Sequence, residues 1–133
     1  SSVIVVDTNI VAYLYLESEY TARAEAQLRG DPDWAVPLLW RGEFRNILAG
    51  VIRRRAMSFD EARRIMAEAK DLLAGGEHEV NSQRVLERVR DSDCSAYDRE
   101  FVVLAAQMGT MLVTMDGKLL KAFPKLARPL PAL

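Results

Sequence analysis

The sequence predicts an α/β three-layer sandwich, in which helices flank both faces of a mostly parallel sheet of four or five strands. Two short apolar runs, residues 3–6 and 111–114, are typical of strands that are buried on both faces in a parallel sheet. Segments with the helical period of apolar residues lie between the candidate strands. In such a fold the carboxyl ends of the parallel strands meet at one crevice, which is where we expect the function.

The first half of the chain shows signals for two strands and four helices. The apolar spacing becomes helical at Thr8, and the turn Gly30-Asp31-Pro32 ends the second helix. Ser58 and Glu61 form a capping box, and Gly75-Gly76 ends the helix that this box opens. These signals predict strands at 3–6 and 34–36. They also predict a helix that begins at about residue 8, a second helix that ends at residue 30, and two more helices over 38–55 and 58–73.

The second half begins with a short expected edge strand at 79–80 and a helix from 81 or 82 to about 89. Ser95 is the expected N-cap of a helix that runs to about residue 108, and Gly109 ends it. The strand at 111–114, a short helix at 117–123 and one edge strand in the proline-rich tail, residues 126–133, complete the pattern. No linker or repeat divides the chain, so we expect one domain over residues 1–133.

Composition limits the classes of function and the compartment. Eighteen Lys and Arg residues against 19 Asp and Glu give a net charge of −1, so any contact with nucleic acid must come from local patches. Cys94 is the single cysteine, which excludes an internal disulfide and a structural zinc cluster of cysteines. No apolar run approaches the roughly 20 residues that cross a bilayer, and the first residues lack the pattern of a signal peptide. We therefore expect a cytoplasmic protein with no membrane contact.

Acidic side chains occupy matching positions after two predicted strands. Asp7 directly follows residues 3–6, and Asp116 follows residues 111–114 by two positions. If these strands are parallel neighbours, the two carboxylates converge at one edge of the sheet. Asp98, in the first turn of the helix that Ser95 opens, can face the same crevice.

Glu43 lies within the apolar stripe of its helix, between Leu39 and Ile47. Three or four carboxylates in a partly desolvated crevice repel one another, so they either take up protons or bind a cation. Ligands that are oxygen atoms alone favour Mg²⁺ or Mn²⁺. Such an ion serves displacement at phosphorus, so the acids predict hydrolysis of a phosphate ester.

These residues resemble the PIN-domain ribonucleases, and within them the toxins of VapBC-type toxin–antitoxin pairs. The resemblance spans nearly the whole chain. The segments that carry it are Val5-Val6-Asp7-Thr8-Asn9, Glu43 in its helix, Ser95-Ala96-Tyr97-Asp98 before an apolar helix, and Leu112-Val113-Thr114-Met115-Asp116.

The resemblance implies a PIN-like fold and a Mg²⁺- or Mn²⁺-dependent endoribonuclease that leaves a 5′-phosphate and a 3′-hydroxyl. It also implies a VapB-like antitoxin whose C-terminal segment covers the active-site groove. The residues that it assigns to the metal site are Asp7, Glu43, Asp98 and Asp116, with Asn9 and Thr114 as polar supports. Asp93 is an alternative or additional ligand, although Asp98 is favoured because it alone precedes the apolar helix.

Each acid also has a purely structural interpretation. Asp7 is a favoured N-cap, Asp98 interacts well with a helix dipole, and Asp116 precedes Gly117 in a common turn pair. Glu43 can form a salt bridge between helices, because an acid in an apolar stripe needs a partner. A single metal site explains all four acids together, and we therefore favour it.

Two surfaces suggest partners. Residues 41–70 carry eight basic and four acidic side chains, and Arg41, Arg45, Arg53 and Arg54 are candidates for weak contact with RNA, with a solvated helical hairpin as the alternative. Residues 10–16 are all apolar, so an antitoxin, a second copy of the chain or the domain itself must cover that helix. We expect a homodimer.

Two further functions compete with the ribonuclease. A phosphomonoesterase that forms an aspartyl-phosphate on Asp7 is disfavoured, because enzymes of the haloacid dehalogenase type carry a second Asp where this chain has Asn9. A binding module without catalysis, whose acids are caps and ion pairs, is the third interpretation.

Overall fold

The computed structural model describes residues 2–91 and 95–133 of the chain. In chain order the elements are β1 (Val3–Val6), α1 (Thr8–Tyr15), α2 (Thr21–Gly30), β2 (Asp33–Pro37), α3 (Trp40–Arg53), α4 (Phe59–Leu72), β3 (Glu77–His78), α5 (Ser82–Arg88), the 3₁₀ helix η1 (Val89–Asp91), α6 (Ala96–Met108), β4 (Leu112–Val113), α7 (Gly117–Ala122) and β5 (Ala127–Arg128). None of these helices is both long and apolar enough to span a membrane.

The five strands form one sheet in the order β3-β2-β1-β4-β5, and every pairing is parallel. Val5 of β1 lies between its register partners Ala35 of β2 and Leu112 of β4. The first strand of the chain is therefore the centre of the sheet. The predicted α/β sandwich with a parallel sheet is confirmed, including the edge strand in the tail.

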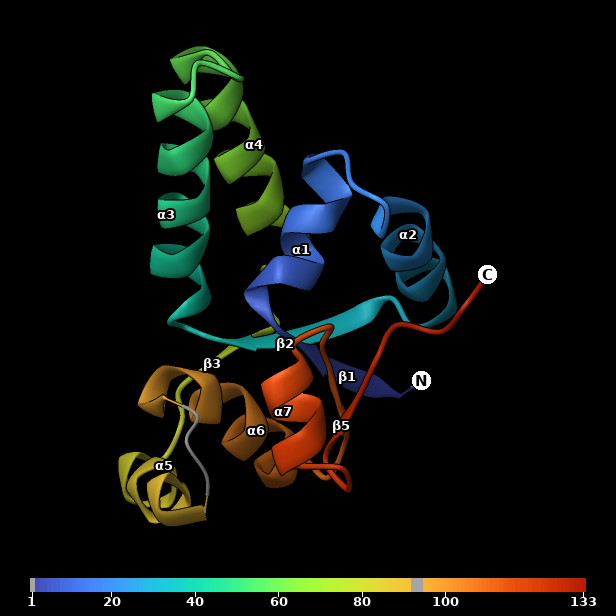
Figure 1. The fold of residues 1–133 in the computed structure, drawn as a ribbon, viewed down its shortest axis with the longest axis vertical. Helices are drawn as coiled ribbons and strands as arrows, with labels where there is room; N and C mark the ends of the chain where they lie inside the picture. The colour runs from blue at the N-terminus through green and yellow to red at the C-terminus, as the bar shows by residue number, and fades with distance from the viewer. Residues whose placement is uncertain (1, 92–94) are drawn as a thin grey trace.

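Side chains alternate along the strands between two hydrophobic clusters. Ile4 and Val6 of β1 belong to the cluster under α1, α2, α3 and α4, whereas Val5 belongs to the cluster shared with α6 and α7. Figure 1 shows the same division, with α1 to α4 on one side of the sheet and α5 to α7 on the other. Helices on both faces bury residues 4–6 of β1, residues 34–37 of β2 and both residues of β4, which explains the apolar runs of these strands.

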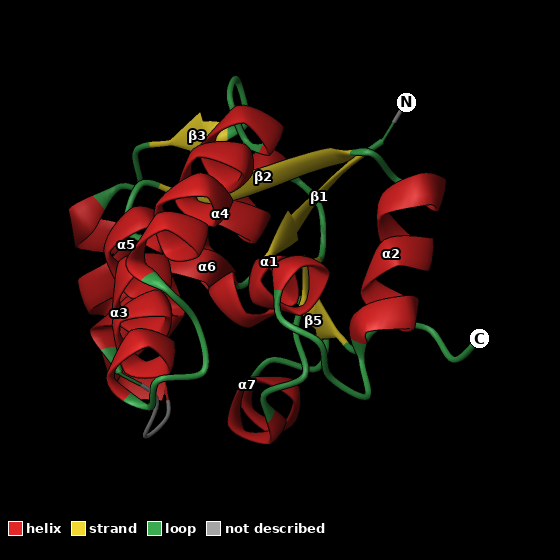
Figure 2. Ribbon diagram, turned by 90° about the horizontal axis from the view of Figure 1, so that it is seen from above, coloured by secondary structure: helices red, strands yellow, loops and turns green. Residues whose placement is uncertain are grey.

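Helix boundaries follow from capping side chains and one glycine. Ser58 and Ser95 each accept the backbone N–H three residues ahead, as the sequence predicts for N-caps. Gly109 ends α6 in the left-handed conformation, at φ 66°. Figure 1 shows α3 and α4 running side by side as a hairpin. Figure 2 shows α2 on the other side of α1, near the C-terminus of the chain.

The edge strand β3 lies at Glu77–His78, so its prediction at 79–80 is wrong by two residues. Gly76 explains the shift. A Cβ atom on Gly76 would lie 2.2 Å from the Trp34 carbonyl oxygen, so only glycine allows the chain to approach β2 here. Val36 then donates to the Gly76 carbonyl and Leu38 to the His78 carbonyl, which fixes the register.

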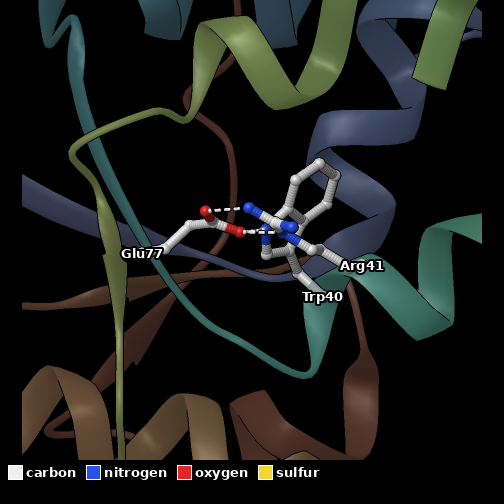
Figure 3. A network of polar contacts seen from close by, with 3 residues as sticks. All are labelled: Trp40, Arg41 and Glu77. Atoms are coloured by element: carbon white, nitrogen blue, oxygen red, sulfur yellow. Dashed lines mark hydrogen bonds and ion pairs between the residues drawn. The ribbon is translucent and has the colours of Figure 1, made fainter. Parts of the chain in front are cut away.

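The start of α3 is tied to β3 by side chains (Figure 3). Arg41 donates two hydrogen bonds of 2.6 Å, from Nε and Nη2, to the two carboxylate oxygens of Glu77. The indole N–H of the fully buried Trp40 donates to Glu77 Oε2 at 2.6 Å. These contacts lower the pKa of Glu77, with the Arg41 hydrogen bonds as the main cause. The helix begins at Trp40 rather than at the predicted residue 38.

The first turns of the apolar helix α1 are buried by the chain itself. Ile10, Val11 and Ala12 are buried in the core. At its C-terminal end the Tyr13 ring packs on Tyr20 and the Tyr15 ring packs edge-on against Phe44 of α3. Residues 13–16 pack against the core but stay partly exposed, so the domain covers residues 10–12 fully and residues 13–16 only in part.

Candidate functional site

One pocket of about 240 Å³ lies at the carboxyl ends of β1 and β4. Residues from α1, α3, α6 and α7 surround it together with the loops that follow the two strands. The structure brings four predicted acids to this pocket, although they are far apart along the chain. The lining residues are Asp7, Thr8, Asn9, Glu43, Asn46, Ile47, Asp98, Phe101, Asp116 and Leu119.

Asp7 is the most buried of the four acids, with 8% of its surface exposed. It is the N-cap of α1, and its Oδ1 accepts the Ile10 N–H at 3.2 Å. The Thr114 hydroxyl donates to Oδ2. Burial raises the pKa of Asp7 from 3.8 to about 6, against the opposing effect of these hydrogen bonds, and Asp116 and Glu43 add repulsion. The cap that the sequence offers as an alternative thus exists within the pocket.

Thr114 links Asp7 to Asp116. Its side chain is fully buried just after β4, and its hydroxyl oxygen accepts the Asp116 N–H at 3.0 Å. Asp116 Oδ1 accepts the Lys118 N–H at 2.8 Å and so caps α7. One hydroxyl therefore connects the loops after two neighbouring strands.

Glu43 enters the pocket from the first turns of α3 and is half-buried. The Thr8 hydroxyl donates to its Oε1 at 2.6 Å. Burial raises the pKa of Glu43, the Thr8 hydrogen bond lowers it, and the charges of Asp98 and Glu100 raise it further. The inter-helix salt bridge, the alternative interpretation of Glu43, is absent within residues 2–91 and 95–133, where no basic side chain pairs with Glu43.

Asp98 lies in the first turn of α6, and its N–H donates to Ser95 Oγ at 3.1 Å. The neighbouring Arg99 is fully buried and donates to the backbone carbonyls of Arg88, Val89 and Ser95. This arginine holds the start of α6 against the end of α5. Asp93, the alternative ligand, lies outside the described residues.

The donor set fits a hard divalent cation. No Lys, Arg or His is among the described residues that line the pocket, and the four carboxylates offer only oxygen atoms. Their repulsion contributes to the raised pKa of Asp7 and of Glu43, and a bound cation would relieve it. Within the described part of the chain, no group of three or more His, Cys, Asp or Glu side chains lies in an arrangement that could hold a metal ion. It is the chemistry of the donors that fits such an ion.

Sequence reasoning missed three residues and placed another differently. Thr8 and Asn46 line the pocket, and Glu100 adds negative charge beside Glu43. Asn46 follows Glu43 by three positions on α3, a spacing that could have indicated it. Asn9 lines the pocket but is exposed, and among the described residues it bonds to none of the four acids.

The four candidate arginines differ in availability. Arg41 is committed to Glu77, which raises the pKa of Arg41 through their hydrogen bonds. Arg45, Arg53 and Arg54 are exposed on α3 and at its end. Only these three remain free to meet a polyanion.

The sequence over residues 4–126 matches the PIN domain family. None of the curated proteins compared with the chain matches it. Among solved structures, the fold is similar to PAE2754 from Pyrobaculum aerophilum, with 21% identity and a TM-score of 0.76 over 96% of this chain and 83% of that chain.

Two assemblies contain chains of similar fold. A chain of a toxin–antitoxin complex from Klebsiella pneumoniae is 17% identical, with a TM-score of 0.65 over 98% of this chain and 99% of that chain. A chain of VapBC2 from Rickettsia felis, bound to a DNA fragment from their promoter, is 13% identical, with a TM-score of 0.60 over 98% and 100%. At these identities the likeness is one of fold.

Proposed function

The chain belongs to the PIN domain family, and on this premise we propose that it is a Mg²⁺- or Mn²⁺-dependent endoribonuclease and the toxin of a type II toxin–antitoxin pair. The observation that carries the proposal is the pocket at the carboxyl ends of β1 and β4, which four carboxylates line and where no lining residue that the structure describes is basic. A divalent ion is the partner that such a group of acids lacks.

In this proposal Asp7, Asp98 and Asp116 hold the ion, and Glu43 either joins them or orients the attacking water. When bound, the ion would neutralise the phosphoryl oxygens and lower the pKa of the attacking water. The chain itself keeps the acids in place. Thr114 donates to Asp7 and accepts the Asp116 N–H, so these two carboxylates stay in register across the two strands.

The substrate would be RNA approaching along α3. A pocket lined by acids repels a polyanion, so positive charge beside it must supply the attraction. The exposed arginines at 45, 53 and 54 are candidates for these phosphate contacts. Ile47, Phe101 and Leu119 add apolar side chains to the pocket wall.

The expected partners remain a VapB-like antitoxin and a second copy of the chain. The similar chains in toxin–antitoxin assemblies support the antitoxin. We propose that residues 1–133 act as one nuclease domain in the cytoplasm.

A cleavage assay tests the proposal. The wild-type protein, freed of metal and then given Mn²⁺, should cut single-stranded RNA internally, and Asp7→Asn should abolish cutting while the protein stays folded. Asp71→Asn, an exposed acid on α4, is the matched control and should behave as the wild type. Metal-dependent cutting by Asp7→Asn at the wild-type rate would contradict the proposal.

Assays of RNA and of a small phosphomonoester distinguish the ribonuclease from the phosphomonoesterase. Asp7 is buried and both of its carboxylate oxygens accept hydrogen bonds, which disfavours it as a nucleophile. Hydrolysis of a small phosphomonoester without any cutting of RNA would favour that enzyme instead.

A further inference from the structure

We infer that Thr8 is a positioning residue. Its hydroxyl donates to one carboxylate oxygen of Glu43 and thereby directs the other oxygen toward a metal ion or water that binds in the pocket. This inference rests on the proposed function. Thr8 would touch neither metal nor substrate, and it would act through Glu43 alone.

The contact joins two helices near their first turns. Thr8 is the first residue of α1 and is only 5% exposed, and its Oγ1 donates to Glu43 Oε1 at 2.6 Å across 35 residues of sequence. Since Asp7 directly precedes Thr8, the backbone segment that supplies one acid of the pocket also supplies the donor that fixes another.

The hydrogen bond leaves Glu43 half-satisfied. Among the residues that the structure describes, no donor is bonded to Oε2 of Glu43. That oxygen belongs to a side chain that lines the pocket, so it is available to a ligand there. A carboxylate held by one oxygen and free at the other suits a ligand that must keep one orientation.

Negative charges near Glu43 give such a restraint a purpose. Asp98 and Glu100 both act on Glu43 with like charge, which favours positions of the Glu43 carboxylate farther from these two acids. In the absence of metal, a hydrogen bond from an uncharged hydroxyl counters that tendency without neutralising the carboxylate. Thr8 therefore preserves the negative charge that a cation needs.

Packing between the two helices does not depend on this bond. The Tyr15 ring of α1 contacts Phe44 of α3 edge-on, with centroids 6.2 Å apart, and Phe44 is fully buried. Thr8→Val keeps the shape of the side chain and removes the donor. It should consequently release Glu43 while α1 and α3 stay in place.

The test measures Mn²⁺ binding by electron paramagnetic resonance and, separately, the steady-state kinetics of RNA cleavage. Thr8→Val should weaken Mn²⁺ binding or lower kcat by about 10–100-fold, the range found for residues that orient metal ligands. Thr8→Ser restores the hydroxyl and should lie close to the wild type. Thr110→Val is the matched control, because the Thr110 hydroxyl donates at the same 2.6 Å to the Val3 carbonyl, at the opposite end of β1.

A double-mutant cycle decides whether Thr8 acts through Glu43. In the Glu43→Ala background, Thr8→Val should cause no further change in Mn²⁺ affinity. Equal losses in both backgrounds would overturn the inference, as would wild-type Mn²⁺ binding and kcat in Thr8→Val. If Thr8→Val fails to fold, Thr8→Ala and Thr8→Ser give the same comparison. Failure of the wild type to cut RNA would refute the proposed function instead, and the Mn²⁺ binding data would still test the role of Thr8.

Discussion

The hydroxyl of Thr114 donates to the buried carboxylate of Asp7, 107 residues away along the chain. The same oxygen accepts the N–H of Asp116, so a single uncharged side chain holds the loops after β1 and β4 together. Two carboxylates that repel each other are thus fixed at the pocket by a group that neutralises neither.

Thr114→Val should destabilise the protein by about 1–3 kcal/mol, because it leaves a buried carboxylate oxygen and a backbone N–H without partners. Thr114→Ser keeps the hydroxyl and should lower the free energy of unfolding much less. Urea denaturation of the metal-free proteins measures both. Equal stabilities for Thr114→Val and the wild type would show that this contact contributes nothing.

Asp7 should make the metal-free protein less stable as the pH rises. Its pKa in the folded state, about 6, lies above the ordinary value of 3.8, so between these values the folded protein holds a proton that the unfolded chain has lost. Stability from this group is therefore lost as the pH rises from about 4 to 6. Above pH 6, the raised pKa of Asp7 makes the free energy of unfolding about 3 kcal/mol lower than it is below pH 4.

Asp7→Asn should remove this pH dependence and unfold at a higher temperature than the wild type at pH 7.5, since asparagine is uncharged and still caps α1. Asp71→Asn, at an exposed site, should leave the pH profile unchanged. The measurement is the melting temperature across pH 4 to 8 in the presence of a chelator. Parallel profiles for the wild type and Asp7→Asn would contradict the raised pKa.

Mn²⁺ should stabilise the folded protein by mass action. At a hundred times the dissociation constant the gain is about 2.7 kcal/mol, which corresponds to a shift of the melting temperature on the order of 10 °C. Asp7→Asn should reduce the shift, whereas Asp71→Asn should not. The absence of any shift at millimolar Mn²⁺ would favour the binding module with structural acids.

Glu77→Ala should destabilise the protein more than Arg41→Ala. Removal of Glu77 leaves the indole N–H of the fully buried Trp40 without its acceptor, at a cost of about 1–3 kcal/mol. Removal of Arg41, whose side chain is 40% exposed, leaves that bond in place and breaks only a solvent-screened pair. Chemical denaturation of the two variants gives the ranking, and the reverse order would refute it.

Arg45→Ala should weaken RNA binding without changing kcat, because Arg45 is exposed on the helix that carries Glu43. The dependence of binding on salt should also fall, by about 0.7 in the logarithmic slope for one lost phosphate contact with a single strand. Arg29→Ala is the control, since Arg29 is exposed and belongs to α2, a helix on the other side of α1 from α3. Equal effects of the two substitutions would exclude a contact specific to α3.

Local signals in the sequence were sufficient for most elements and for the positions of the acids. Asp7 and Asp116 follow buried strands, and strand order then places them together. The cap and the pocket residue are not exclusive interpretations, because Asp7 and Asp116 each cap a helix and also line the pocket. An acid that caps a helix directly after a parallel strand lies at the carboxyl end of that strand, and therefore at the crevice.

Contacts between distant segments could not be predicted. The bond from Thr8 to Glu43 depends on how α1 packs against α3, and no local pattern encodes that rotation. The register of β3 depends on the close approach of Gly76 to Trp34, which a search for strand-forming residues at 79–80 cannot detect. The buried role of Arg99 likewise depends on carbonyl groups of the preceding helix.

The position of β1 at the centre of the sheet has a consequence for synthesis on the ribosome. The strand made first cannot gain its neighbour β4 until more than a hundred further residues have been translated, on the order of 5 to 20 seconds later. Until then the nascent chain lacks Thr114 and Asp116, and no truncated product that ends before them contains a complete set of acids. The pocket is therefore complete only after Asp116 has been translated.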